Sequence, residues 1–289
     1  MIWPTAHRCA ALVTPLTLLL TGVCATPIAA SAQRALPAPT AWRFTWTIAS
    51  TADGKAVNAG AMVLDVAVWK GTVRITVREG PLRAVTGEDG TILLRAADST
   101  LAVIKPARRE ALSAAASDLG AMLGGPGAGF PLEVSDASST TRVLGGGARA
   151  FGHATRRVEL TQRYTIEIST PTVRRSLRTK QVHDIEISRE IGRLDPGFRV
   201  FAEQFARALG LPHAVRTRLR ALERSMPEGM PVRTTTTAVT VADTDTLRTT
   251  MRAEMALLRQ ERVDTTTFVI PAGFRVTDMS RLLQRGRLP

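Results

Sequence analysis

One short segment combines side chains that bind metals or transfer protons. His183, Asp184 and Glu186 stand within four residues of one another, and imidazole and carboxylate groups are common metal ligands. The segment Val182–Ser188 alternates apolar and polar residues as a β-strand does. On a strand, Asp184 and Glu186 share one face and His183 points to the other. We therefore expect a solvated strand face here and no metal site.

The sequence lacks the common catalytic motifs. It contains no G-x-S-x-G, H-E-x-x-H, P-loop or C-x-x-C pattern. The letters G-x-G-x-x-A at Gly145, Gly147 and Ala150 do not open a helix after a parallel strand, so they predict no nucleotide site. We assign no catalytic residue, metal or cofactor. A hydrolase whose site is built from strand-borne acids and a histidine is kept as an alternative.

Aromatic side chains provide the candidate binding residues. Three of them alternate with polar residues in the segment 41–50, which predicts a half-buried strand. Such a face can line an apolar pocket, or it can be plain core against a helix that carries three phenylalanines. The candidate ligand-binding residues are Trp42, Phe44, Trp46, Phe198, Phe201 and Phe205.

The chain is strongly basic, with a formal net charge of +13. Nearly all of its cations are arginines, and they are scattered along the chain without a dense basic block. An arginine-rich surface for anionic lipids or polymers is one reading, and the coding bias of a GC-rich genome is the other. We expect no nucleic acid as a natural partner, because we expect the protein to be exported.

Short alternating segments separated by turns predict a mainly antiparallel sheet. Lys70-Gly71 is one such turn. We expect strands at 41–50, 60–69, 73–77, 91–96 and 101–104, and later at 131–135, 140–144, 154–160, 164–168, 182–188, 232–242 and 247–257.

Changes of period predict a few helices over this sheet. Pro106–Met122 and Asp195–Met226 have apolar residues at helical spacing, and Asp195-Pro196 is an N-cap followed by a proline at the first helical position. Val276–Gln284 predicts a short terminal helix. A glycine-rich connector occupies 124–129. The expected fold class is α+β, a curled, mainly antiparallel sheet or incomplete barrel covered by a few helices.

The first 32 residues have the features of a secretory signal peptide. A weakly basic start precedes an apolar stretch, which threonine, proline and glycine interrupt too often for a membrane span. We expect cleavage after Ala32 and an extracytoplasmic location, periplasmic or secreted, with lipid anchoring at Cys24 as the alternative. Cleavage would remove Cys9 and Cys24, so the mature chain would form no disulfide.

The remaining chain predicts a linker and one domain. Residues 33–40 contain two prolines and form the linker, and 41–289 form the domain. No later segment has the length and apolar character of a membrane span.

The end of the chain carries a specific motif. Residues 268–274 read F-V-I-P-A-G-F, which resembles the F-x-x-P-x-G-[FY] ending of an uncharacterised family of exported bacterial proteins. That family is similar in outline to the periplasmic lipoprotein carriers, in which a curled antiparallel sheet and helices enclose an apolar cavity. The resemblance implies this architecture and supplies no catalytic residues. Physically, the motif should stop a strand at Pro271, turn at Gly273 and anchor Phe268 and Phe274 in the core.

These observations lead to a non-enzymatic exported protein. We expect it to bind a lipid, another apolar ligand or an envelope partner. The alternatives are an arginine-rich binder of anionic surfaces or polymers, and a cryptic hydrolase.

Overall fold

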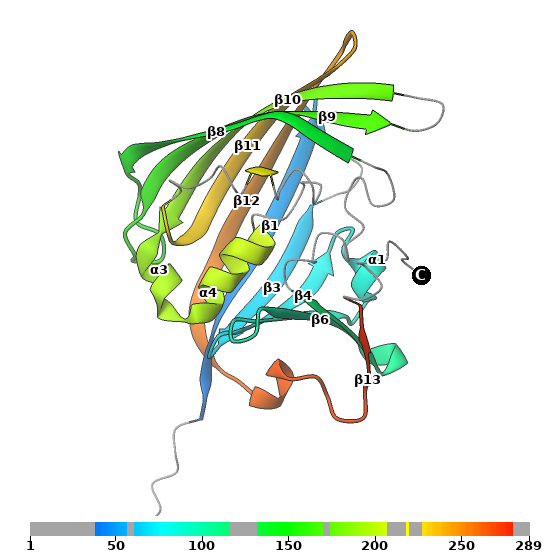
Figure 1. The fold of residues 1–289 in the computed structure, drawn as a ribbon. Coiled ribbons are helices and arrows are strands. Elements are labelled where there is room, and N and C mark those ends of the chain that lie inside the picture. The colour runs from blue at the N-terminus through cyan, green and yellow to red at the C-terminus, as the bar shows by residue number, and fades with distance from the viewer. Residues whose placement is uncertain are drawn as a thin grey trace, which may run out of the picture. The chain divides into compact units, whose positions relative to one another are not determined.

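A single β-sheet dominates the described part of the chain (Figure 1). The computed structural model describes residues 38–56, 61–115, 132–169, 174–206, 218–219 and 227–279, all within the compact unit Ala38–Pro289. The strand order is β13-β7-β6-β5-β4-β3-β1-β12-β11-β10-β9-β8, with β2 paired to β1 beside this path. Neighbouring strands are antiparallel except for β13 and β7, which are parallel. The curled sheet is not closed into a barrel, and β13 and β8 form its edges.

The strands run as follows: β1 Thr40–Ala52, β2 Lys55–Ala56, β3 Met62–Trp69, β4 Thr72–Glu79, β5 Thr91–Arg95, β6 Thr100–Lys105, β7 Glu110–Ala115, β8 Leu132–Gly146, β9 Arg156–Ser169, β10 Arg174–Ser188, β11 Met230–Ala242, β12 Asp245–Arg262 and β13 Arg275–Asp278. The short helices are α1 Arg83–Thr86, η1 Pro106–Arg108, α3 Arg189–Leu194, α4 Pro196–Val200, η3 Phe201–Ala206 and η4 Thr265–Phe268.

Alternating side chains give the sheet two different faces. In β1, Phe44, Trp46 and Ile48 are buried on one face, in the main hydrophobic core, while Arg43 and Thr45 belong to the other. In Figure 1 the sheet curls around α3 and α4. We call the face that these helices lie against the concave face, and the opposite face the convex face.

The first half of the sheet is the predicted meander. Strands β3, β4, β5 and β6 follow one another as antiparallel neighbours. Lys70 and Gly71 have φ values of 46° and 80° in the β3–β4 turn. Two consecutive residues with positive φ are typical of the tight hairpin turn that matches the twist of the strands. The turn predicted at these residues is confirmed.

The helix predicted over Pro106–Met122 is wrong in its described part. Only the single turn η1 is helical, and β7 pairs with β6. Alanine, leucine and glutamate favour helix in isolation. Pairing with β6 instead buries Ala111 and Ala114 and satisfies the backbone of that strand. Residues 116–122 and the connector 124–129 lie outside the described residues.

Two strands of the second half each unite two segments that the sequence predicts as separate strands. β8 includes the predicted segments 131–135 and 140–144, except for residue 131. β9 includes 164–168 and most of 154–160. The prediction of separate strands is therefore wrong. In β8 the register shifts between Ser135 and Ser138, where Asp136 has a φ of 49°. A β-bulge absorbs these turn-forming residues without ending the strand.

The helix start predicted at Asp195 is confirmed, although the unpredicted helix α3 precedes it after β10. The Asp195 side chain accepts a hydrogen bond from the Gly197 amide, and Pro196 occupies the first turn of α4. A Cβ atom on Gly197 would lie 2.6 Å from Cγ1 of Val68, so only glycine permits this close approach of α4 to β3. Beyond residue 206, the described part of the predicted helical region consists of Arg218 and Leu219.

The C-terminal motif covers part of the convex face. Phe268 packs with Ala41 and Ala67, and Ile270 and Phe274 pack against a second cluster on β5, β6 and β7. Gly273 has the expected positive φ, at 77°. The terminal helix predicted from Val276 is wrong within the described residues, because β13 there pairs with β7. The open edge of β7 offers backbone hydrogen-bond partners to this segment.

The predicted curled antiparallel sheet is therefore confirmed, and the helices among the described residues are few and short. Among the described residues, no helix is both long and apolar enough to cross a membrane.

Candidate functional site

Four of the aromatic candidate residues pack directly against one another. The rings of Phe44 and Phe198 are stacked at 5.7 Å, and Phe201 lies edge-on to Phe44 and Trp46 at 5.3 and 5.7 Å. All four side chains are at most 3% exposed. Trp42 is partly buried at the border of the same core. These residues form one aromatic cluster, and their contact with a ligand stays a prediction.

The sixth candidate residue, Phe205, belongs to the backbone of η3. Its side chain lies outside the described part of the structure.

Beside the apolar core, the concave face carries a polar network on β9, β10 and β11. His183 makes two hydrogen bonds there, from Nδ1 to Thr236 Oγ1 at 2.8 Å and from Nε2 to Gln162 Oε1 at 3.0 Å. A glutamine carbonyl oxygen only accepts, so Nε2 carries the proton and Nδ1 accepts from the threonine hydroxyl. Burial lowers the pKa of His183 to about 4. The imidazole is therefore neutral at pH 7.

A second part of this network surrounds Tyr164. Gln181 donates from Nε2 to the Tyr164 hydroxyl at 2.9 Å, and burial raises the pKa of Tyr164 to about 12. Thr179 and Thr240 share a hydrogen bond of 3.1 Å on the neighbouring strands. Leu219 packs against Tyr164 on the concave face and is itself 1% exposed. The network is thus largely shielded from water and carries no charge at pH 7.

Three buried polar atoms have no hydrogen-bond partner in the part of the chain that the structure describes. They are Trp46 Nε1, Ser139 Oγ and Gln181 Oε1. Ser139 and Gln181 are both paired with Gln162, from the two strands that flank β9. Directly opposed residues point to the same side of a sheet. All three atoms therefore belong to the concave face.

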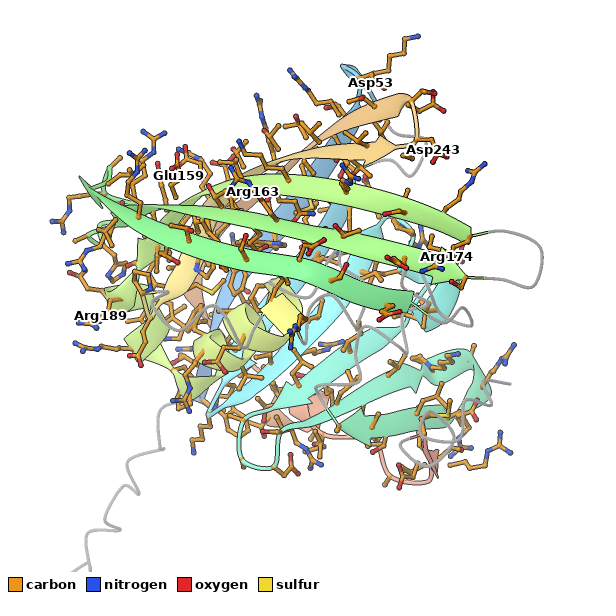
Figure 2. The ribbon with its side chains drawn as sticks, turned by 45° about the horizontal axis from the view of Figure 1, so that its top comes forward. Asp53, Glu159, Arg163, Arg174, Arg189 and Asp243 are labelled. Atoms are coloured by element: carbon orange, nitrogen blue, oxygen red, sulfur yellow. The ribbon has the colours of Figure 1, made fainter. Side chains whose placement is uncertain are left out.

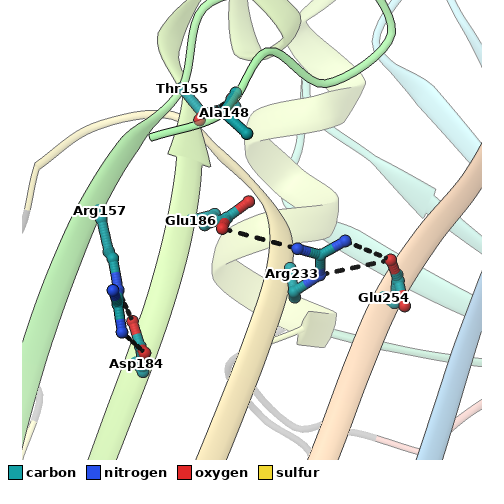
Figure 3. Close-up of polar contacts among 7 residues, drawn as sticks. All are labelled: Ala148, Thr155, Arg157, Asp184, Glu186, Arg233 and Glu254. Carbon is teal, nitrogen blue, oxygen red and sulfur yellow. Dashed lines mark hydrogen bonds and ion pairs between the residues drawn. The ribbon is translucent and has the colours of Figure 1, made fainter. Parts of the chain in front are cut away.

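The carboxylates of the His-Asp-x-Glu segment point away from this network. Asp184 accepts from Arg157 Nε at 2.8 Å, and Arg157 holds the pKa of that carboxyl below its usual range. Glu186 lies 3.6 Å from Arg233, which also donates to Glu254 at 2.8 Å (Figure 3). The prediction that His183 faces away from Asp184 and Glu186 is confirmed.

The convex face of β8, β9 and β10 carries several ion pairs. Glu159 and Arg163 extend from β9, and Arg174 from the start of β10 (Figure 2). Arg142 pairs with Glu159 at 3.2 Å, and Arg174 with Glu167 at 2.8 Å. No three His, Cys, Asp or Glu side chains among the described residues converge as metal ligands.

His153 belongs to a separate place at the end of the sheet. Its Nδ1 lies 3.2 Å from Glu190 of α3, whose carboxylate also accepts from the Ala154 amide. These contacts hold the segment before β9 against α3.

Sequence reasoning did not select Gln162, Gln181 or Thr236. The sequence does indicate one of them: Gln162 alternates with Leu160 and Tyr164, so its side chain points to the same face of the strand as theirs. A polar side chain at an inward position needs a buried partner, and it marks a polar patch.

Comparisons with known proteins identify no family. No protein family matches the sequence, and no curated protein matches it. Two crystal structures of a protein called PNGF-II, in space groups C2 and P21, have TM-scores of 0.36 and 0.33 at 8% and 6% identity. The matches cover 86% of this chain but only 32% and 33% of those chains, so this chain spans about a third of their length. A likeness at this level does not indicate a shared function.

Proposed function

We propose that this protein is a non-enzymatic, exported binding protein that holds a lipid or another apolar ligand on the concave face of its sheet. The observation that carries the proposal is the position of the three buried polar atoms without partners among the described residues. All three lie on the concave face: Trp46 Nε1 belongs to the aromatic cluster, and Gln181 Oε1 and Ser139 Oγ lie beside the network of His183.

A buried polar atom without a partner costs about 1–3 kcal/mol. A ligand that offers a hydrogen-bond donor to Gln181 Oε1 would remove part of this cost. The neighbouring apolar side chains would contact the ligand's hydrocarbon part, which favours burial by about 25 cal/mol per Å².

The lining also suggests the kind of polar group. The Gln162, Gln181 and Thr236 side chains are uncharged, and His183 is neutral at pH 7 because burial lowers its pKa to about 4. An uncharged hydroxyl, ester or amide group suits such a lining better than a carboxylate or phosphate, which would need a counter-charge.

Native mass spectrometry of the protein exported from a heterologous host tests the proposal, followed by organic extraction and titration with a fluorescent diacylglycerol. We expect a co-purifying apolar molecule or saturable diacylglycerol binding. The Gln181→Leu and Ser139→Ala variants should bind the probe several-fold more weakly.

A neighbouring serine supplies the matched control. Ser138 is exposed and lies on the other side of β8 from Ser139, so Ser138→Ala should bind like the unmodified protein. A folded protein that carries no apolar molecule and does not bind the probe would contradict the proposal. Equal binding by Gln181→Leu, Ser139→Ala and Ser138→Ala would also do so.

A further inference from the structure

A hollow of about 280 Å³ on the convex face is lined by four arginines from three strands. Arg43 comes from β1, Arg74 and Arg78 from β4, and Arg259 from β12. The intervening strand β3 contributes Asp65. The hollow lies on the opposite side of the sheet from the aromatic cluster. Its arginine side chains point to the convex face, whereas Phe44 and Trp46 point to the concave face.

Three of these arginines stand in one row across four neighbouring strands. Arg43 is directly opposite Arg259 on one side and Ala67 on the other, and Ala67 is in turn opposite Arg74. Like charges at opposed positions destabilise a sheet. The small side chain of Ala67 leaves the hollow between the two longer arginines.

A β-bulge places Arg259 in this row. Two residues of β12, Leu257 and Leu258, oppose Phe44 alone, because the register shifts from Arg43↔Arg259 to Thr45↔Ala256. Leu257 has a φ of 59° and is 62% exposed, whereas Leu258 packs against the concave core. Without the bulge, strict alternation through both leucines would direct Arg259 into the apolar core. The strained backbone at Leu257 therefore serves the arginine row.

The carboxylates around the hollow compensate only part of its positive charge. Glu261 accepts from Arg43 at 3.1 Å and also from Arg259, while Asp65 pairs with Arg78 at 2.6 Å. Arg74 forms no ion pair with any described residue. Desolvation and the charge of Arg43 both lower the pKa of Arg74. Four arginines against two carboxylates leave two positive charges, because Arg43 and Arg259 share Glu261 and Arg74 has no carboxylate partner among the described residues.

We propose that this hollow binds a phosphate group, held between Arg43, Arg74 and Arg259. A phosphate group supplies one or two negative charges and several acceptor oxygens, which match the planar donor sets of guanidinium groups. Its charge would offset the repulsion along the arginine row. The proposal concerns the convex face and is independent of ligand binding on the concave face.

Calorimetric titration of the purified protein with inorganic phosphate at low salt tests the site. We expect saturable binding that weakens as sodium chloride is added. Arg74→Gln and Arg259→Gln should each lower the affinity about tenfold or more, the loss expected for a hydrogen bond to a charged group. Phosphate should raise the melting temperature of the unmodified protein more than that of either variant.

Arg252→Gln is the charge-matched control. Arg252 is exposed on β12, seven residues before Arg259, and does not line the hollow. Its variant should bind phosphate like the unmodified protein. The proposal is overturned if the folded protein binds no phosphate at millimolar concentration. It is equally overturned if Arg74→Gln and Arg259→Gln bind as tightly as Arg252→Gln.

Sedimentation with vesicles identifies the source of the phosphate group. Binding to phosphatidylglycerol vesicles that inorganic phosphate competes away, and that Arg74→Gln loses, supports the site and assigns it to a lipid headgroup. Binding of free phosphate without sedimentation supports the site and assigns it to a soluble phosphate compound.

Discussion

Polar residues at inward strand positions give the concave face its character. Gln162, Gln181 and His183 occupy the same sheet face as the buried aliphatic residues Val158 and Ile185. Their hydrogen bonds run across β9, β10 and β11 and join side chains far apart in the sequence. Such a network is favourable only while each member keeps its partner.

The pH dependence of stability should report on His183. Its pKa is about 4 in the folded protein, against 6.5 ordinarily. Between these values the unfolded chain binds a proton that the folded protein does not, so stability is complete above pH 6.5 and falls toward pH 4. The loss should reach about 2–3 kcal/mol. Urea denaturation at a series of pH values measures it.

Two histidine variants make this measurement specific. His183→Gln should remove most of the decline between pH 6.5 and pH 4. His153→Gln should retain it, because that ring contacts Glu190 outside the network. The same decline in His183→Gln as in the unmodified protein would refute the assignment to His183.

At the scale of elements, one carboxylate joins a helix to a hairpin. Asp195 Oδ1 accepts from the Gly197 amide at 2.8 Å and from the Gly71 amide at 2.7 Å. The first bond caps α4, and the second connects this cap to the β3–β4 turn. The cap thereby positions Phe198 and Phe201 over Phe44.

Asp195→Ala should lower the free energy of unfolding by about 2–3 kcal/mol, because it removes a cap and leaves a second amide without its acceptor. Chemical denaturation measures the change. Asp264→Ala is the control, since the exposed Asp264 side chain caps only the short turn η4 through Thr266. It should cost about 1 kcal/mol or less. Equal losses in the two variants would show that the link to Gly71 contributes nothing.

At the scale of the whole sheet, the C-terminal segment covers convex positions that would otherwise expose apolar surface. Phe268 is 3% exposed and lies 5.6 Å from the ring of Trp69, measured between centroids. Further along, β13 pairs with β7 at the edge of the sheet. The last described segment thus contacts both β1, through Ala41, and β7.

Phe268→Ala should therefore lower the free energy of unfolding by about 3–5 kcal/mol, the usual cost of truncating a buried phenylalanine. Thermal or urea unfolding measures it. Val269, the next residue, is 55% exposed, so Val269→Ala should change stability by about 0.5 kcal/mol or less. A Phe268→Ala variant as stable as Val269→Ala would mean that this segment does not stabilise the sheet.

The sequence by itself determined the strands whose side chains alternate and the helix start that carries its own cap. Trp42–Ile48, Met62–Val68 and Asp195-Pro196 are examples. The composition of Leu247–Leu257 is ambiguous between helix and strand, and the strand expected there is confirmed in β12. Alternation and capping are local, so they can be read within a few residues.

Only the tertiary structure decided which segments complete the edges of the sheet and which side chains meet. Glu110–Ala115 and Arg275–Asp278 are strands because each lies beside an open strand edge, a fact absent from their composition. Arg43 meets Arg259 and His183 meets Thr236 through pairings between distant parts of the chain. Register and bulges set these contacts, and both depend on the partner strand.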